Sequence, residues 1–385
     1  MATATRLSGF GTTIFTEMSA LAERTGAINL GQGFPDEDGP ADVLEAAVAA
    51  LRNGRNQYAP LPGVPALRRA VAEHQRRFYG IELDPDAEVQ VTMGATEAIA
   101  AAVLGLCEPG DELIALDPSY DSYAAAAAMA DVRFVPVPLH PPEWTLDGDE
   151  LAAAVTDRTR MVLLNTPHNP TGRVLSRPEL DAVAAVCRER ELIAVTDEVY
   201  EHLVFDGEHV PLATLPGMAE RTLTISSLGK TFSVTGWKVG WASGPAPLVA
   251  AVRAAKQFLT FAGATPFQHA GAAALRLGDE FYAAFARELG AKRDRLCDGL
   301  AAAGLTVLRP QGTYFANVDA GGDGAEFCRA LVSAAGVVAI PTSVFSAEPE
   351  RLSPYVRFAF CKRPGVIDEA ARRLAAHASE AARAS

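Results

Sequence analysis

Lys230 stands in the stretch "SSLGKTFSVTGWKVGW", residues 226–241, among small, aliphatic and aromatic residues. Most lysines are solvated surface charges, because an unpaired ammonium is rarely buried, so this setting favours a chemical role. A phosphate-binding P-loop is excluded since its first glycine would fall at Thr224, and the serine acylase motif S-x-x-K lacks its companion motifs. The third possibility is a lysine that forms a Schiff base with an aldehyde cofactor.

Two further segments could bind such a cofactor. "MGATEAI" places Gly94, Ala95 and Thr96 at a helix start, whose free N–H groups suit a phosphate, although Thr96 could simply cap the helix. "TDEVYEHLVF" has Asp197 at the end of a strand. Its carboxylate could pair with a protonated pyridine nitrogen, although a lone aspartate there is more often a helix cap. These segments therefore predict places for a phosphate and a pyridine ring.

Four other polar residues have both a chemical and an ordinary interpretation. Tyr120, in "DPSYDS", could stack on an aromatic ring or pack at a core edge. Asn169, in "NTPHNPTG", could be a ligand or a turn residue. Lys238 could meet a phosphate or stay in solvent, and Arg357, in "YVRFAF", could clamp a carboxylate or lie on an exposed strand. Taken singly, these residues leave the choice open.

The elements that would position these residues are short apolar runs alternating with Ala/Leu/Arg stretches of helical period. This alternation predicts a parallel sheet with helices on both faces. Polar residues follow each run, including Ser227 after the last, and ligands bind at the carboxyl ends of such strands. The runs are "EVQVT" at 88–92, "ELIAL" at 112–116, "MVLLN" at 161–165, "LIAVT" at 192–196 and "TLTIS" at 222–226.

Composition limits the class of protein. The 385 residues, 49% of them hydrophobic, suffice for a large domain and a smaller one. The formal charge of −13 argues against binding to nucleic acid, and the longest apolar run, 98–107, is too short to span a membrane. Five scattered cysteines without C-x-x-C fit a reducing cytoplasm. The sequence has no H-E-x-x-H motif, so we expect no catalytic metal. We expect a soluble cytoplasmic protein with a small-molecule partner.

Taken in this order and spacing, "NTPHNPTG", "TDEVYEHLVFDG" and "SSLGKTFSVTGWKVGW" resemble the class I aminotransferases, which are fold type I pyridoxal-phosphate enzymes. The resemblance extends over nearly the whole chain. "NLGQGFPDEDGP" at 29–40 and "NQYAPLPGVPALRRA" at 56–70 resemble the kynurenine, glutamine and methionine aminotransferases and their actinobacterial N-succinyldiaminopimelate aminotransferase-like relatives. The implied fold has a mostly parallel central sheet, helices on both faces and a smaller α+β domain.

The resemblance implies a role for each candidate around bound pyridoxal 5'-phosphate. Lys230 becomes the Schiff-base lysine, Asp197 the partner of the pyridine nitrogen, and Tyr120 the stacking residue. Asn169 and Tyr200 would contact the ring's phenolic oxygen, with Tyr200 also counted among the catalytic residues. The phosphate would be held by Gly94, Ala95, Thr96, Ser227 and Lys238. Arg357 would bind the substrate's α-carboxylate, while Gly33, Phe15 and Asn169 would line the substrate pocket.

The resemblance also implies a homodimer with shared active sites, because Tyr58 matches a tyrosine that reaches the phosphate of the neighbouring subunit. We expect an arm over residues 1–25 outside both cores, a small α+β domain over 26–41 and 280–385, and a large cofactor-binding domain over 42–279. One segment departs from the family pattern. Ala262 and Gly263 in "FAGATPF" stand where larger or polar residues are common, which predicts room for a bulky side chain.

The expected reaction is a ping-pong transfer of an amino group from an L-amino acid to a 2-oxo acid. A β-lyase of the cysteine-conjugate type on the same scaffold is the alternative, since both reactions pass through the same carbanion at Lys230. A ligand-sensing regulator would need an added DNA-binding segment, which we do not expect. A catalytically silent relative is disfavoured by the presence of both Lys230 and Asp197.

Overall fold

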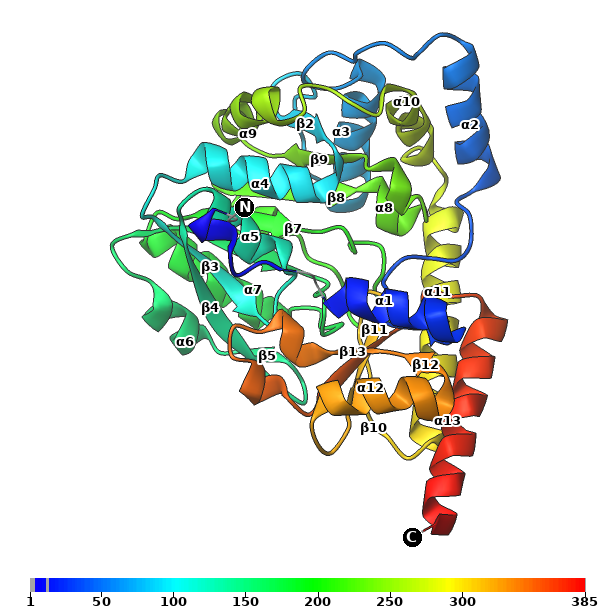
Figure 1. Ribbon diagram of the computed structural model, residues 1–385. Helices are drawn as coiled ribbons and strands as arrows, with labels where there is room; N and C mark the ends of the chain where they lie inside the picture. The colour runs from blue at the N-terminus through cyan, green and yellow to red at the C-terminus, as the bar shows by residue number, and fades with distance from the viewer. Residues whose placement is uncertain (1–3, 12–13, 385) are drawn as a thin grey trace.

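The computed structural model describes residues 4–11 and 14–384, except for the side chains of residue 15 and residues 380–384. Figure 1 shows a large part built around a broad sheet and a smaller part that carries the C-terminus. The long helix α11 (Asp279–Ala302) extends from the large part along the side of the small one. The chain therefore has the two-part organisation that the composition predicts.

The large part contains an eight-stranded, mostly parallel sheet, as the sequence predicts. All five predicted strands are present and run in the same direction, because only β9 and the edge strand β5 are antiparallel to their neighbours. Polar residues that follow these strands therefore meet at one edge. In sheet order the strands are β2 (Val89–Thr92), β9 (Gly240–Ser243), β8 (Thr222–Ser227), β7 (Ile193–Asp197), β6 (Thr159–Asn165), β3 (Glu112–Asp117), β4 (Arg133–His140) and β5 (Thr145–Leu146).

Helices cover both faces of this sheet, which explains why its central strands are largely apolar. Leu113 and Ala115 of β3 pack in one core with α4 (Gly94–Leu106), α5 (Ser122–Met129) and α9 (Ala246–Leu259). Ile114 and Leu116 point to the opposite face, toward α6 (Gly148–Ala154) and α7 (Arg177–Glu189). The alternation of side chains along each strand thus serves two separate cores.

A third core closes the β2 edge of the sheet. It packs Val89 and Trp241 against α2 (Ala41–Arg52), α3 (Pro65–Tyr79) and α10 (Thr265–Ala274). The short helix α8 (Leu228–Thr231) adds Leu228 to this core. Because α8 follows β8 directly, this packing fixes the backbone that carries Lys230.

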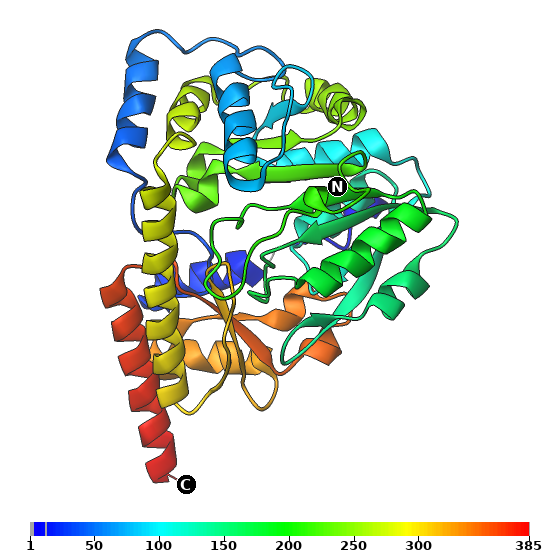
Figure 2. The ribbon, with the colours of Figure 1, turned by 180° about the vertical axis from the view of Figure 1, so that it is seen from behind.

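The small part combines an antiparallel sheet with three long helices. Its strand order is β10 (Thr306–Leu308), β11 (Phe315–Asp319), β14 (Tyr355–Ala359) and β13 (Ile340–Pro341). Helix α12 (Gly324–Ala335) packs beside these strands, while α11 and α13 (Pro364–Ala384) lie side by side in both views (Figures 1 and 2). β1 (Ile28–Asn29) pairs with β12 (Val337–Val338), which supports grouping 26–41 with 280–385. The boundaries at 42 and 279 remain predictions.

The N-terminal segment is only partly an arm. Residues 14–25 form α1, whose Met18 and Ala22 are buried in the core of the small part. Residues 1–25 therefore do not all stay outside both cores, because α1 has an apolar face that packs beside β12 and α12. Among the described residues, only 4–11 remain for an arm outside both cores.

Candidate active site

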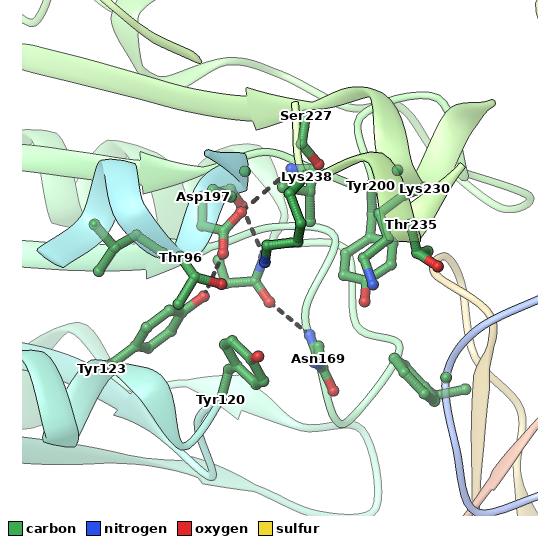
Figure 3. A pocket seen from close by; sticks show the side chains of 18 of the residues that line it. Thr96, Tyr120, Tyr123, Asn169, Asp197, Tyr200, Ser227, Lys230, Thr235 and Lys238 are labelled. Carbon is green, nitrogen blue, oxygen red and sulfur yellow. Dashed lines mark hydrogen bonds between the residues drawn. The ribbon is translucent and has the colours of Figure 1, made fainter. Parts of the chain in front are cut away.

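A cavity of about 260 Å³ lies at the carboxyl ends of the parallel strands (Figure 3). Twelve of the fourteen predicted site residues line it, although they come from segments more than 300 residues apart. These are Gly33, Gly94, Ala95, Thr96, Tyr120, Asn169, Asp197, Tyr200, Ser227, Lys230, Lys238 and Arg357. The fold thus gathers the polar residues that follow five strands, as expected for an open α/β sheet.

Lys230 lies on α8, just after β8, with its side chain half-buried at the cavity wall. Its Nζ donates a hydrogen bond to the Tyr314 hydroxyl at 2.9 Å, and that hydroxyl donates to the Gly33 carbonyl at 2.7 Å. Loss of solvent around the amine lowers the pKa of Lys230 to about 8. A substantial fraction of this amine is therefore neutral and nucleophilic near neutral pH.

Asp197 is the last residue of β7 and is buried. Its carboxylate accepts a hydrogen bond from the Tyr123 hydroxyl at 2.7 Å and a longer one from the Val199 N–H at 3.4 Å. Burial raises the pKa of Asp197 to about 6, since the two donors and Lys230 offset only part of the lost hydration. A cationic ring nitrogen in the cavity would stabilise the ionised Asp197 carboxylate and so offset the rest of its lost hydration.

The first turn of α4 borders the cavity and has no side-chain cap. Gly94 has a φ of 75°, and a Cβ at this position would stand 3.2 Å from Lys238 Nζ. Lys238 itself has a left-handed backbone (φ 52°), which a lysine rarely adopts without a functional reason. The free N–H groups of α4 and the ammonium of Lys238, here called the cradle, are a donor set that suits a phosphate.

Arg357 projects from β14 into the cavity between two aromatic rings. Its guanidinium carbon lies 4.0 Å from the ring centre of Phe315 and 4.4 Å from that of Phe345. The guanidinium donates to Asn169 Oδ1 at 2.9 Å and to the Gly31 carbonyl at 3.1 Å. Burial lowers the pKa of Arg357 to about 10, so it stays charged at neutral pH. Because Asn169 Oδ1 is an acceptor here, the Nδ2 group of Asn169 is left to donate into the cavity.

Several lining residues are absent from the sequence prediction. Tyr123 is one helical turn beyond Tyr120, and Asn165 ends β6 and donates through Nδ2 to the Asp197 carbonyl at 2.7 Å. The rule of polar residues at strand ends could have found Asn165. Phe315 comes from the small part, so only the tertiary fold brings it here. Tyr314, next to it, contacts Lys230 without lining this cavity. The others are Ile99, Val199, Gly229, Thr235 and Val239.

Of the two remaining predicted residues, one lies outside this arrangement and the other has a side chain that the structure does not describe. Tyr58 is 81% exposed and packs edge-on against Phe261, with ring centres 5.6 Å apart, so it does not line the cavity of its own chain. Phe15 belongs to α1, but its side chain lies outside the described part of the structure. Ala262 and Gly263 also miss the cavity, and a Cβ at Gly263 would stand 2.4 Å from Met93 Sδ. A side chain at position 263 would therefore clash with Met93 of the same subunit, which explains why glycine stands there.

The cavity fits pyridoxal 5'-phosphate. A reactive amine suits its aldehyde, the buried Asp197 carboxyl suits its pyridine nitrogen, and the cradle at Gly94, which a Cβ would fill, suits its phosphate. On a mostly parallel sheet this combination defines the fold type I transferases that use this cofactor. The chain belongs to the aminotransferase class I and II family, which it matches over residues 25–374.

Known proteins of similar sequence and structure are aminotransferases. The probable N-succinyldiaminopimelate aminotransferase of Mycobacterium tuberculosis is 53% identical, over 97% of this chain and 98% of that protein. The methionine aminotransferase of Escherichia coli is 44% identical, over 96% and 97%. The solved structure of the N-succinyldiaminopimelate aminotransferase from Mycobacterium tuberculosis covers 98% of this chain and 100% of that one, with a TM-score of 0.95 and 54% identity.

These findings confirm the predicted family, cofactor and reaction class. The protein is a pyridoxal-phosphate-dependent aminotransferase that acts on amino acids and 2-oxo acids. The β-lyase alternative is not favoured, since the relatives above are amino-group transferases. None of the helices in the described ranges is both long and apolar enough to span a membrane.

Proposed function

We propose that this aminotransferase takes its amino group from L-amino acids with long, bulky or neutral side chains and passes it to a 2-oxo acid by a ping-pong mechanism. Methionine, glutamine, kynurenine and N-succinyldiaminopimelate are the candidate donors. The similarity to N-succinyldiaminopimelate and methionine aminotransferases supports this choice. Aspartate is expected to be a poor donor.

The proposed roles rest on the family resemblance and on the residues that line the cavity. Bound pyridoxal 5'-phosphate supplies an aldehyde for the amine and a ring that stabilises negative charge at the substrate's α-carbon. Asp197 would keep the pyridine nitrogen protonated, while Tyr200 and the Nδ2 group of Asn169 would donate to the phenolic oxygen. Tyr120 would pack on the ring. The phosphate would be held by Ser227, Lys238 and the first turn of α4, residues 94–96.

Lys230 is the proposed acid–base residue. Its neutral fraction near pH 8 allows the amine to accept a proton from the substrate's α-carbon and to return it elsewhere on the same face. Tyr314 holds the Nζ of Lys230 by the 2.9 Å hydrogen bond, and Gly33 in turn orients the Tyr314 hydroxyl. The Nζ of Lys230, which would carry the proton, is therefore held in place by residues next to the proposed substrate pocket.

The observation that carries the substrate proposal is the buried guanidinium of Arg357. It is the only arginine among the described residues that line the cavity, and its planar fork matches one carboxylate through two parallel hydrogen bonds. Phe315 and Phe345 hold the fork between their rings. One carboxylate-binding arginine suits the α-carboxylate of every amino acid and leaves none for the side-chain carboxylate of aspartate.

The proposal also includes a homodimer that works in the cytoplasm. Tyr58 lies too exposed to serve its own cavity, so a role at the phosphate requires a second subunit. In that dimer, Phe15, Tyr58 and the 261–263 segment would border the substrate side chain. All five cysteines are buried and unpaired, as a reducing compartment permits.

A panel of amino donors with 2-oxoglutarate and pyruvate tests this proposal. We expect methionine, glutamine, kynurenine or N-succinyldiaminopimelate to give the highest kcat/KM and aspartate one of the lowest. Arg357→Lys should lower kcat/KM for all donors together, by about a hundredfold, because a lysine cannot form the paired hydrogen bonds. Arg177→Lys, on the exposed face of α7, is the matched control. A preference for aspartate would refute the substrate proposal and leave the aminotransferase family unaffected.

A further inference from the structure

A cluster of histidine and glutamate side chains lies outside the cofactor cavity. His74 comes from α3, and Glu201 and His202 from the turn that follows β7. The Nε2 atoms of the two imidazoles face each other at 2.7 Å, and one carboxylate oxygen of Glu201 lies within 4.8 Å of both. None of the three residues lines the cofactor cavity. Three potential metal ligands therefore converge on one point.

The charges around this point are unbalanced. Glu201 is only 6% exposed, and its Oε1 accepts a hydrogen bond from Ser226 at 2.7 Å. Its Oε2 has only the neutral Tyr79 hydroxyl nearby and no charged partner among the described residues. The neighbouring Glu198 is also buried, but it already pairs with His209 at 2.9 Å. A buried carboxylate without a cation is costly, so the cluster lacks one positive group beside Glu201.

At a separation of 2.7 Å the two facing Nε2 atoms can share only one proton, so at least one of them presents a lone pair. An imidazole lone pair beside a buried carboxylate without a charged partner is a donor set that divalent transition metals prefer.

We propose that His74 Nε2, His202 Nε2 and the Glu201 carboxylate bind a divalent transition-metal ion, with Zn²⁺ as the best match. Two histidines and one glutamate are a known zinc donor set, and the half-buried His202 gives the ion a path from the surface. Two nitrogens on a tetrahedral zinc lie about 3.3 Å apart, so binding would separate the rings by roughly half an ångström.

The ion would have a structural role. It would tie α3 to the turn at 199–202, which follows Asp197 and contains Tyr200, and Ser226 would link it to the end of β8. The ion would not contact the reacting groups. A structural ion of this kind is compatible with the expectation that the enzyme has no catalytic metal. The alternative explanation of the same geometry is a hydrogen bond between two neutral imidazoles, with no ion bound. The charge deficit at Glu201 favours the metal.

The test uses the full-length, cofactor-loaded enzyme without a histidine tag, first stripped with a chelator and then titrated with Co²⁺ or Zn²⁺ alone. We expect one ion per chain with micromolar or tighter affinity, a visible Co²⁺ ligand-field band typical of four-coordination, and a higher unfolding temperature. His202→Phe and Glu201→Gln should each weaken binding by about a hundredfold. His140→Gln, a surface histidine paired with Glu150, should bind like the parent.

Two outcomes would overturn the proposal. The first is the absence of stoichiometric Co²⁺ binding to the unmodified enzyme, which needs no variant to fold and would leave the imidazole hydrogen bond as the explanation. The second is unchanged binding in both His202→Phe and Glu201→Gln, since the ion would then lie elsewhere. The visible absorbance of the bound cofactor reports whether each variant is folded.

Discussion

At the scale of single residues, Tyr314 is the most informative addition to the predicted site. Its hydroxyl accepts from Lys230 and donates to Gly33, so it connects the reactive amine with the segment that borders the substrate. Tyr314→Phe should lower kcat by about tenfold and change KM little, because a hydrogen bond that orients Lys230 is lost while the ring is retained. Steady-state kinetics with one good donor measure this split.

Tyr355→Phe is the matched control for Tyr314→Phe. Tyr355 also lies in the small part, but its ring packs on Trp144 and does not line the cavity. Removal of its hydroxyl should leave both kinetic parameters near those of the parent. Equal kinetics for the two variants would show that the hydroxyl of Tyr314 does not position the lysine.

The raised pKa of Asp197 predicts a pH dependence of cofactor binding. Below about pH 6 this buried carboxyl is protonated in the free enzyme, so it cannot pair with a protonated pyridine nitrogen. The affinity of the apoenzyme for pyridoxal 5'-phosphate should therefore be full above pH 6 and fall as the pH decreases through this value. Binding titrations between pH 5 and 8 measure the effect.

Asp197→Asn separates this titration from that of the cofactor's own phosphate. The variant should bind more weakly at pH 8 and should lack the part of the pH dependence that comes from residue 197. If parent and variant lost affinity in parallel as the pH fell, the titrating group would be the phosphate, and the proposed pairing would be wrong.

At the scale of secondary structure, the first turn of α4 gives a sharp test of the phosphate cradle. Gly94→Ala would place a Cβ 3.2 Å from Lys238 Nζ at a backbone φ of 75°. We expect the dissociation constant of the cofactor to rise about tenfold or more, since a charged hydrogen-bond donor is displaced. Titration of the apoenzyme with cofactor gives this constant.

Gly110→Ala provides the control for backbone strain. Gly110 has a φ of 90°, but no atom lies within 4 Å of the position its Cβ would take. Both alanines should cost about 1 kcal/mol or more of stability through the left-handed backbone, whereas only Gly94→Ala should lose cofactor affinity. A similar loss of affinity in both variants would attribute the effect to general destabilisation.

The elements also show what the sequence can and cannot predict. Strands such as "MVLLN" and "LIAVT" are apolar on both faces because helices cover both, and they were therefore predictable. β4 was not predictable, because Pro136 and Pro138 interrupt its pattern. β3 pairs along one side of β4, but β5 pairs with only its last two residues on the other side, so the two prolines are tolerated there. β9 is short and begins inside the stretch "SSLGKTFSVTGWKVGW" that carries Lys230. Residues after predicted strands gave most of the site, whereas Tyr314 required the packing of two separate parts.

At the scale of the whole molecule, one surface patch remains uncovered. Tyr58, 81% exposed, packs on Phe261, which is 43% exposed, and Phe258 (86%) and Leu259 (47%) stand just before Phe261 in the chain. Exposed aromatic residues gathered in this way mark an interaction surface. The patch includes the residue proposed to reach another subunit's phosphate, so a second copy of the chain is the partner that would also complete the site.

Mixed dimers test this arrangement directly. Tyr58→Ala and Lys230→Ala chains are each expected to be nearly inactive as homodimers. If Tyr58 acts across the interface, a heterodimer holds one intact site, which takes Lys230 from one chain and Tyr58 from the other, and one site with both defects. Random mixing should then restore about a quarter of the native activity. If Tyr58 acted within its own chain, no heterodimer would contain an intact site, and activity would stay at the parental level.

Lys230→Ala mixed with Asp197→Ala is the control, because both residues line the cavity of a single chain. Every heterodimer of this pair should carry one defect in each site, so mixing should restore nothing. Recovery in the Tyr58 pair without recovery in this pair would place the tyrosine across the interface. Recovery in both pairs would instead point to general stabilisation by subunit exchange, and the shared-site dimer would lose its support.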